Sequence, residues 1–153
     1  MVERLRRLIP GRWVGLLLGI AGIAAPAAFA MLARADAGRV VGRFFVVEAW
    51  ASLALAMLLL AIERGRARER AEASQGSVLS TEMLLVLGTV FCTVAGYFAL
   101  QPLMPAARAG QGALSFGQLH AISAAMLVLK IMLLLVLAWR AAGPAAISRR
   151  PSS

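Results

Sequence analysis

The sequence predicts an all-α fold, a four-helix transmembrane bundle, and three observations lead to this fold class. First, 61% of the 153 residues are hydrophobic and the mean hydropathy is +0.81, whereas soluble domains are about 45–50% apolar. Second, the apolar residues form four long runs. Third, charged residues make up 15% of the chain and cluster between the runs. A chain of this length is expected to be a single integral membrane domain.

Each apolar run is close to the roughly 20 residues that a helix needs to cross a hydrocarbon core about 30 Å thick. The runs cover about 13–33, 40–62, 83–100 and 119–139. Lipid offers no hydrogen-bond partner to backbone groups, so each run is expected to be helical.

Capping residues stand at the starts of three of these runs. Asp36 is expected to cap the second helix and Ser80 the third, while Ser115 and Gln118 have the spacing of a capping box before the fourth. These boundaries support the division into four helices.

The connections differ in length and polarity. Pro102 and Pro105 are expected to stop the third helix. Segment 63–80 is a polar, cytoplasmic loop that can prolong the second helix before a Ser-Gln-Gly-Ser break at 74–77. Residues 140–153 are expected to form a flexible cytoplasmic tail.

The first run has a second interpretation, as a secretory signal. Its basic start and the small residues Ala28-Phe29-Ala30 before Met31 match a cleavage site, and cleavage would leave three spans. The run is longer than the usual apolar core of about 7 to 15 residues in a signal, so we expect it to be retained. Pro26 inside it is expected to kink the helix.

Small residues recur every four positions in the first and third runs, which lets another helix approach the backbone closely. We expect these two helices to be neighbours, or the stripes to form a seam with a second copy or another membrane protein. The stripes consist of Gly11, Gly15, Gly19 and Gly22 in the first run and of Gly88, Cys92 and Gly96 in the third.

The formal net charge is +9, and the basic residues that produce it flank the apolar runs. We therefore expect contact with the lipid bilayer and no nucleic-acid partner. Eleven arginines lie before the first run, between the second and third, or after the fourth. The opposite side carries only Arg34, Arg39, Arg43 and Arg108. The positive-inside rule therefore predicts cytoplasmic termini. The Arg-, Ala- and Gly-rich composition indicates a bacterial protein, hence the inner (cytoplasmic) membrane.

Two charged residues lie well inside their runs. A charge near the helix centre costs about 2.5–3.5 kcal/mol on insertion scales, so Glu48 and Lys130 each need a partner or a wet cavity. Counted from Asp36 and from Ser115, their depths differ by about 5 Å at 1.5 Å per residue, which a lysine side chain can span.

Other polar residues share the faces of these two. His120, Ser123 and Lys130 fall within an arc of about 80° on the fourth helix, and Ser52 lies one turn from Glu48 on the second. These five residues form a candidate intramembrane polar site. One interpretation is a proton- or ion-linked path through Glu48 and His120 with Lys130 as charge partner, and the other is a structural ion pair beside a hydrogen-bonded histidine.

The sequence does not contain catalytic or metal-ligating residues at the spacing that enzymes and metal proteins require. Cys92 is the single cysteine, so a disulfide within the chain is excluded and a cysteine metal cage has no ligand set. A copper relay through Met126, Cys92 and His120 lacks any Met- or His-rich spacing. We expect no cofactor, no metal and no enzymatic activity, since paired haem histidines, a nucleotide loop and a nucleophile with its base are not found.

Three short motifs in order resemble the family typified by transmembrane protein 205, which includes bacterial membrane proteins of the DUF4149 type. They are Ala-Pro-x-x-Phe from Ala25, Gly-Arg-x-x-Gly-x-Phe from Gly38 and Leu-His-x-x-Ser from Leu119. The resemblance extends from about Gly15 to Trp139 and implies a four-helix membrane protein without a known reaction. The motif positions are Pro26, Phe29, Gly38, Gly42, Phe44, His120 and Ser123. Leu127 stands where the family often has asparagine, and Glu48 is not carried over.

Three kinds of function follow from the sequence. The one we place first is a structural or accessory component of the membrane. The alternative is a subunit of a small-solute, proton or metal-ion transporter that uses Glu48, His120 and Lys130, and a membrane redox or enzyme subunit comes last.

Overall fold

The structure is a computed structural model, and it describes residues 1–73 and 79–143. Within these ranges the chain is helical with no strand, and four helical spans are long and apolar enough to cross a membrane. The spans are Val2–Met31, Arg34–Glu72, Thr81–Arg108 and Phe116–Ala142. The predicted all-α fold with four membrane-spanning helices is confirmed.

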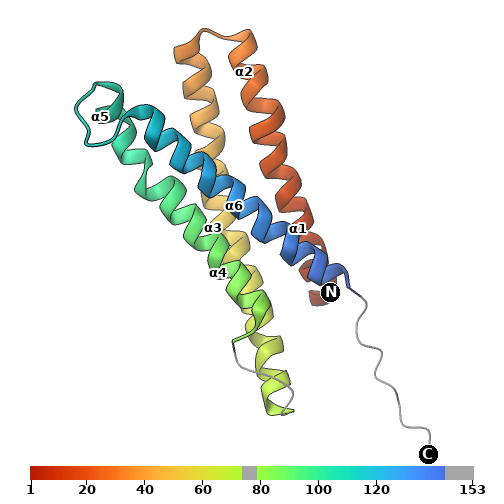
Figure 1. Cartoon of the computed structure of the whole chain (residues 1–153). Coiled ribbons are helices and arrows are strands. Elements are labelled where there is room, and N and C mark those ends of the chain that lie inside the picture. Colours follow the sequence, from red (N-terminus) through yellow and green to blue (C-terminus); the bar gives the residue numbers. More distant parts are fainter. Residues whose placement is uncertain (74–78, 144–153) are drawn as a thin grey trace, which may run out of the picture.

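Two of the spans are composite, and their parts carry separate labels in Figure 1. The first consists of α1 (Val2–Gly19), the π-helical segment η1 (Ile20–Ala24) and α2 (Ala25–Met31). The third consists of α4 (Thr81–Thr93), the π-helical η2 (Val94–Ala99), the 3₁₀ turn η3 (Gln101–Leu103) and α5 (Met104–Arg108). The second and fourth are single helices, α3 (Arg34–Glu72) and α6 (Phe116–Ala142).

The most apolar stretch of each span is largely exposed. Only 11–28% of the most hydrophobic 18-residue window is buried inside the protein. A soluble protein does not leave so much apolar surface in water, so this surface is covered by the lipid bilayer. The chain is therefore a multi-pass membrane protein.

The helices extend beyond the apolar runs. α1 begins at Val2, eleven residues before Trp13, and α3 continues to Glu72, so 63–72 is helix rather than loop. α6 ends at Ala142, and the predicted tail thus starts later than residue 140. The expected break at 74–77 and the tail from residue 144 lie outside the described residues.

Two of the predicted caps are confirmed. Ser80 accepts from the backbone N–H of Met83 at 3.2 Å, and Ser115 with Gln118 forms the capping box of α6. The cap at Asp36 is wrong, because α3 already begins at Arg34 and the Asp36 carboxylate pairs with Arg39 instead.

The expected stop at the prolines of the third span is confirmed in part, because the continuous helix of α4 and η2 ends at Ala99 and only the turn η3 and the short α5 follow. Pro102 and Pro105 lie in the first two positions of η3 and α5, where a missing N–H removes no helical hydrogen bond. The chain bends there, and the helical path ends only at Arg108, shortly before Gly110 with its φ of 71°. In the first span, Pro26 is the second residue of α2, just after the π-helical turn η1, which agrees with the expected local distortion.

The four spans form a bundle in which each helix has two main neighbours (Figure 1). α1 packs on α6 and α3, and α4 likewise packs on α6 and α3. The first and third spans are therefore across the bundle from each other, and the expectation that they are neighbours is wrong. Gly88 and Gly96 instead meet Leu133 and Met126 of α6.

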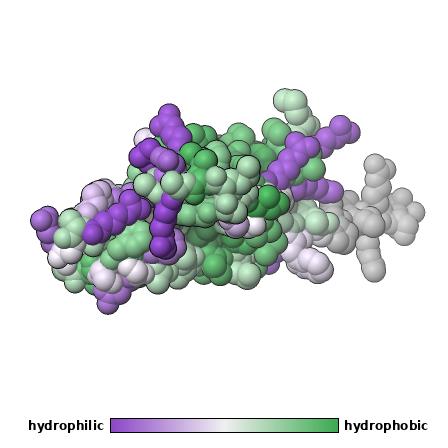
Figure 2. Space-filling model, turned by 90° about the horizontal axis from the view of Figure 1, so that it is seen from above, coloured by the Kyte–Doolittle hydropathy of each residue, from purple (hydrophilic) through white to green (hydrophobic). Residues whose placement is uncertain are grey.

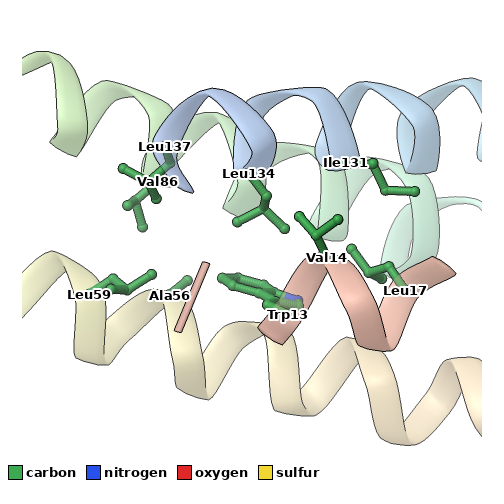
Figure 3. Close-up of a cluster of buried hydrophobic side chains, with 9 residues drawn as sticks. All are labelled: Trp13, Val14, Leu17, Ala56, Leu59, Val86, Ile131, Leu134 and Leu137. Atoms are coloured by element: carbon green, nitrogen blue, oxygen red, sulfur yellow. The ribbon is translucent and has the colours of Figure 1, made fainter. Parts of the chain in front are cut away.

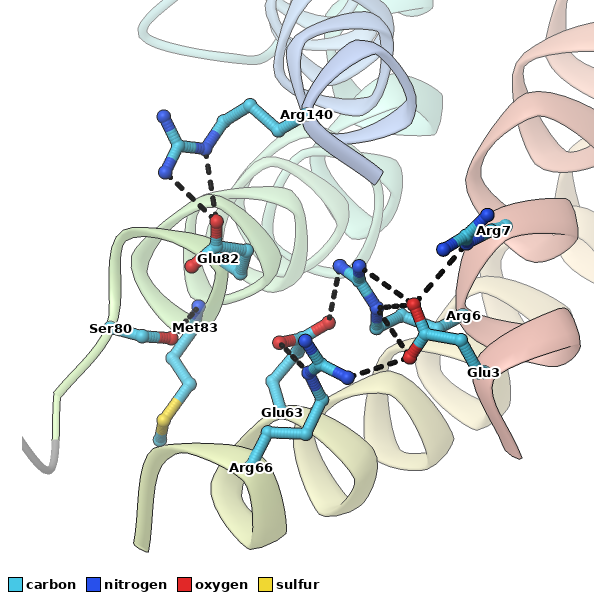
Figure 4. A network of polar contacts seen from close by, with 9 residues as sticks. All are labelled: Glu3, Arg6, Arg7, Glu63, Arg66, Ser80, Glu82, Met83 and Arg140. Carbon is cyan, nitrogen blue, oxygen red and sulfur yellow. Dashed lines mark hydrogen bonds and ion pairs between the residues drawn. The ribbon is translucent and has the colours of Figure 1, made fainter. Parts of the chain in front are cut away.

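One end of the bundle, called the terminal end, carries the start of α1 and the finish of α6 (Figure 1). Ion pairs join the helices there. Arg6 of α1 pairs with Glu63 of α3 at 3.5 Å, and Arg66 of α3 pairs with Glu3 at 2.6 Å. Arg140 of α6 reaches Glu82 of α4 at 2.9 Å, so the ion pairs at this end join α1 to α3 and, separately, α4 to α6 (Figure 4).

Above these ion pairs lies the hydrophobic core (Figure 3). Side chains from four helices meet, and the largest of them are almost fully buried. The cluster consists of Trp13, Val14 and Leu17 of α1, Ala56 and Leu59 of α3, Val86 of α4, and Ile131, Leu134 and Leu137 of α6. The half of the bundle nearest the terminal end is therefore densely packed.

The opposite end, called the distal end, carries the turn at 32–33 and α5. Here α2 packs on α3, while η2 and α5 pack on α6, so the two groups of helices diverge (Figure 1). Seen from this end, hydrophilic side chains stand out at the margins with hydrophobic surface between them (Figure 2).

A candidate polar site beneath an open cavity

The two charges that the sequence places inside the membrane form an ion pair at the centre of the bundle. Lys130 Nζ of α6 lies 2.8 Å from Glu48 Oε1 of α3, and the two residues are 2% and 5% exposed. α3 and α6 are across the bundle from each other, so the pair spans its middle. The sequence left open whether each charge has a partner or a wet cavity, and in the structure the two charges are partners.

Ser52 joins this pair, as the predicted polar strip on the second helix implies. Its hydroxyl donates to Glu48 Oε1 and accepts from Lys130 Nζ at 2.7 Å. The indole Nε1–H of Trp13 also donates to the hydroxyl, at 3.0 Å. Hydrogen bonds of this kind replace the water that both charges lose on burial. We refer to Trp13, Glu48, Ser52 and Lys130 as the central polar cluster.

Trp13 was missed by sequence reasoning, which placed it at the start of an apolar run and hence at the membrane surface. The helix in fact begins at Val2, so Trp13 lies eleven residues inside α1, and Lys130 lies twelve residues before the end of α6. Counting depth from the true ends of the helices, rather than from the apolar runs, would have found it.

Glu48 and Lys130 of the central polar cluster form part of the floor of a cavity of about 530 Å³ that extends toward the distal end. This volume lies within the usual range for small-molecule sites, about 300–1,000 Å³. Four groups of helices contribute to the wall: η1 with α2, α3, α4 with η2 to α5, and α6. The floor residues are Ala21, Glu48, Cys92, Thr93 and Lys130.

The middle of the cavity wall is mostly apolar. Its main contributors from α2, α3 and α6 are Pro26, Val41, Phe45, Ala124 and Leu127. Tyr97 of η2 also lines it. From His120 to Lys130 the wall spans ten residues of α6, so the cavity is about 15 Å deep.

The mouth carries cationic and aromatic side chains. The Arg108 guanidinium of α5 lies 4.7 Å from the centre of the Phe116 ring, and His120 stacks on the same ring with the centroids 5.9 Å apart. Gln101 and Phe29 also line this part. Arg108 has no ion-pair partner among the described residues.

The predicted polar residues of α6 share this cavity but do not form one hydrogen-bonded group. His120 lines the mouth, more than two helical turns from the central polar cluster. Ser123 donates to the backbone carbonyl of Gly96 at 2.8 Å, in the π-helical segment η2 where the regular ladder is disturbed. Ser123 therefore fixes α6 against η2.

The residues that carry the family resemblance gather around the same cavity. Pro26, Phe29, Gly38, Gly42, His120 and Ser123 all line it. Phe44 does not, and its place in the wall is taken by the adjacent Phe45. Three motifs that are far apart in the sequence thus meet at one site, which composition and spacing did not reveal.

The predicted glycine stripes have different environments. A Cβ on Gly96 would lie 2.6 Å from Met126 Cβ, and one on Gly88 would lie 2.9 Å from Leu133 Cδ1. These glycines permit the close approach of α4 and η2 to α6. For Gly15, Gly19 and Gly22 of the first span, no described atom lies within 4 Å of the corresponding position.

The lining of the cavity differs from its mouth to its floor. Among the described residues, no three His, Cys, Asp or Glu side chains come together as a metal site. The cavity instead offers a cationic and aromatic mouth, an apolar middle and a floor with paired charges.

The fold and this cavity define a class, a multi-pass helical membrane protein with a small-molecule-sized cavity open at one end. Residues 8–113, more than half of the chain, match the family described as a domain of unknown function, DUF4149. The chain belongs to this family. No curated protein and no solved structure matches it.

Proposed function

We propose that the protein is a non-enzymatic membrane component that binds a small solute in the distal cavity, as a subunit of a transporter. The observation that carries this proposal is the cavity of about 530 Å³ that ends on the Glu48–Lys130 pair. A purely structural bundle gains nothing from a cavity of this size, because the lost contacts of its lining destabilise the fold.

The distribution of packing supports a transport role. The cavity occupies the distal half of the bundle. The half near the terminal end is filled by the hydrophobic core, and the ion pairs at that end join the helices. This arrangement is the one expected of a transporter open to one side and closed to the other. Transport would require the core around Trp13 and Leu134 to open.

The floor offers groups for a polar solute. Lys130 has three N–H donors, of which two are used by Glu48 and Ser52 among the described residues. Glu48 Oε2 accepts no hydrogen bond within the same ranges, so both residues retain capacity for a solute.

Measurement of solute flux across the membrane of proteoliposomes under a pH gradient tests this function. We expect a solute flux above that of protein-free liposomes, and we expect Ala124→Trp to reduce this flux by filling the cavity. Ala125→Trp is the matched control, since Ala125 is exposed on the same helix and does not line the cavity. His120→Ala tests the mouth. Flux no greater than that of protein-free liposomes contradicts the proposal.

A second candidate is the structural or accessory role that the sequence favours. It is supported by the central polar cluster, in which one hydroxyl and one ion pair join α1, α3 and α6. Under this role Ala124→Trp and Ala125→Trp behave alike, and the partner proteins recovered with the chain depend on the integrity of the bundle.

We also propose that the protein lies in a bacterial inner membrane with both termini in the cytoplasm, and that its motifs reflect kinship with the transmembrane protein 205 family. The arginine distribution supports the orientation. In a Cys92→Ala background, an impermeant maleimide is expected to label Gln111→Cys in intact cells and Arg70→Cys only after lysis. The reverse pattern would invert the topology.

The glycine stripe of α1 supports a contact with a second copy or with another membrane protein. Gly15 and Gly19 have open space where a side chain would be, and small residues favour helix association in lipid. Gly15→Leu is expected to reduce any oligomer seen by light scattering in neutral detergent. An unchanged mass would argue against this seam.

A further inference from the structure

We infer that the ligand of the distal cavity is a small amphiphilic anion, with a carboxylate or phosphate head at Arg108 and an apolar body between α2 and α6. This inference deepens the proposed function and depends on the cavity being a binding site. It rests on the charge of the mouth, the composition of the wall and the side from which the cavity is accessible.

The mouth favours a negative head group. The distal half carries four arginines, Arg34, Arg39, Arg43 and Arg108, and among the described residues its one acidic group outside the central polar cluster is Asp36. Asp36 is already paired with Arg39. Arg108 lines the cavity with its guanidinium against Phe116, which leaves its N–H groups available. A guanidinium binds carboxylate and phosphate oxygens through paired hydrogen bonds.

The wall below the mouth favours an apolar body. Pro26, Val41, Phe45 and Leu127 surround the space through which any ligand must pass. A free inorganic anion would lose its hydration there without gaining partners. An amphiphile keeps its charge at Arg108 and buries its chain against these side chains.

The side of access favours entry from the bilayer. α2 packs on α3 while α6 packs on α1, α4 and α5, and the distal parts of α2 and α6 diverge (Figure 1). Phe29 lines the cavity and is 50% exposed at the α2 edge. A molecule dissolved in the adjacent leaflet can therefore reach the cavity sideways, with its head group held at the membrane surface.

The size of the cavity limits the ligand. Its depth of about 15 Å ends at the Glu48–Lys130 pair, which opposes a longer chain because apolar groups cannot replace the hydrogen bonds of buried charges. The occupant is therefore a single short chain or a compact apolar body, rather than a two-chain phospholipid.

The experiment is equilibrium dialysis of the full chain in a neutral detergent against radiolabelled decanoate, with protein-free micelles as background. We expect saturable binding of one molecule per chain. Unlabelled decanoate displaces it, decanol displaces it at least tenfold less well, and inorganic phosphate does not displace it. Decanol has the same chain without the charge, and phosphate has the charge without the chain.

Two pairs of variants locate the site. Arg108→Gln is expected to weaken decanoate binding by roughly tenfold, as for the loss of a charge-assisted hydrogen bond. Arg34→Gln, at the same end but not in the cavity wall, is expected to change it by less than about twofold. Ala124→Trp abolishes binding, and Ala125→Trp does not. Arg108 is exposed, so its replacement leaves the fold intact.

The results that overturn the inference are distinct. Equal displacement by decanol identifies a neutral lipid, equal displacement by phosphate identifies a free-anion site, and no saturable binding excludes the amphiphile. If any of these occurs while Ala124→Trp still lowers solute flux relative to Ala125→Trp, the proposed function stands and only the ligand class is refuted. If neither tryptophan variant affects flux or binding, both proposals fail.

Discussion

Removing one member of the Glu48–Lys130 pair is expected to destabilise the protein far more than removing both. Lys130→Met leaves the Glu48 carboxylate with only the Ser52 hydroxyl, in a site that is 5% exposed. Glu48→Gln leaves the ammonium group of Lys130 without a counter-charge. Breaking a buried pair in this way costs about 3–5 kcal/mol, comparable to the roughly 2.5–3.5 kcal/mol for placing a charge at the centre of a membrane helix.

The double variant Glu48→Gln, Lys130→Met is expected to lie within about 1–2 kcal/mol of the natural protein. It contains no buried charge, and exchanging a buried ion pair for neutral groups is often neutral or stabilising. The coupling energy of the cycle is therefore expected to be about 3 kcal/mol or more. The measurement is the free energy of unfolding by SDS in mixed micelles, followed by loss of helical circular dichroism.

A second cycle provides the control. Lys130→Met combined with Glu82→Gln removes charges from two separate contacts, because Glu82 pairs with Arg140 near the terminal end. Such changes are expected to add to within about 0.5 kcal/mol. If the Glu48–Lys130 cycle is equally additive, the two charges do not stabilise each other in the folded protein, and the reasoning about the central polar cluster is refuted.

Three further predictions concern the packing of the spans. Gly96→Ala is expected to destabilise the protein by about 1–3 kcal/mol, as overpacking of a filled core does, because its Cβ would lie 2.6 Å from Met126 Cβ. Gly15→Ala, which has open space around it, is expected to be neutral in the same SDS titration. Equal effects of the two variants would contradict the close approach of η2 to α6. Ser115→Ala removes the hydroxyl of the capping box and is expected to destabilise α6 by about 0.5–2 kcal/mol, measured in the same way, whereas no change would show that the cap contributes nothing in the membrane. The intact mass of the purified protein is expected to include the first span, because α1 supplies Trp13 and Leu17 to the core; a product that begins near Met31 would contradict a fold in which this span is retained.

Much of the candidate site was accessible from the sequence. Glu48 and Lys130 are conspicuous because lipid penalises unpaired charges, and their depths on two helices differ by only about 5 Å, which made a contact between them feasible. Ser52 followed from helical spacing. His120 and Ser123 were placed on the right face of α6, and the structure brings both to the cavity wall.

Other parts of the site depended on features that have no local signature. Trp13 became a member of the central polar cluster only because α1 continues through its arginines to Val2, where Arg6 is neutralised by Glu63 across the bundle. Arg108 reached the cavity because η3 and α5 continue the third span beyond the end of η2 at Ala99. Neither outcome can be derived from hydropathy, since both depend on contacts between distant segments.

The sequence by itself determined the class of protein and the number of spans. The length of an apolar run is matched to a bilayer of constant thickness, and a backbone in lipid has to satisfy its own hydrogen bonds, so four runs mean four helices whatever their arrangement. The caps at Ser80 and Ser115 act within a few residues and were also predictable, whereas the one expected at Asp36 was not formed.

Only the tertiary structure decided which helices are neighbours and where the bundle is hollow. The glycines of the first and third runs have the same spacing. Nevertheless, Met126 packs against Gly96, whereas no described atom lies within 4 Å of the position of a Cβ at Gly15. Spacing describes one face of one helix, whereas packing depends on the side chains that another helix brings to that face. The divergence of α2 from α6 arises in the same way, and it opens the cavity on which the proposed function depends.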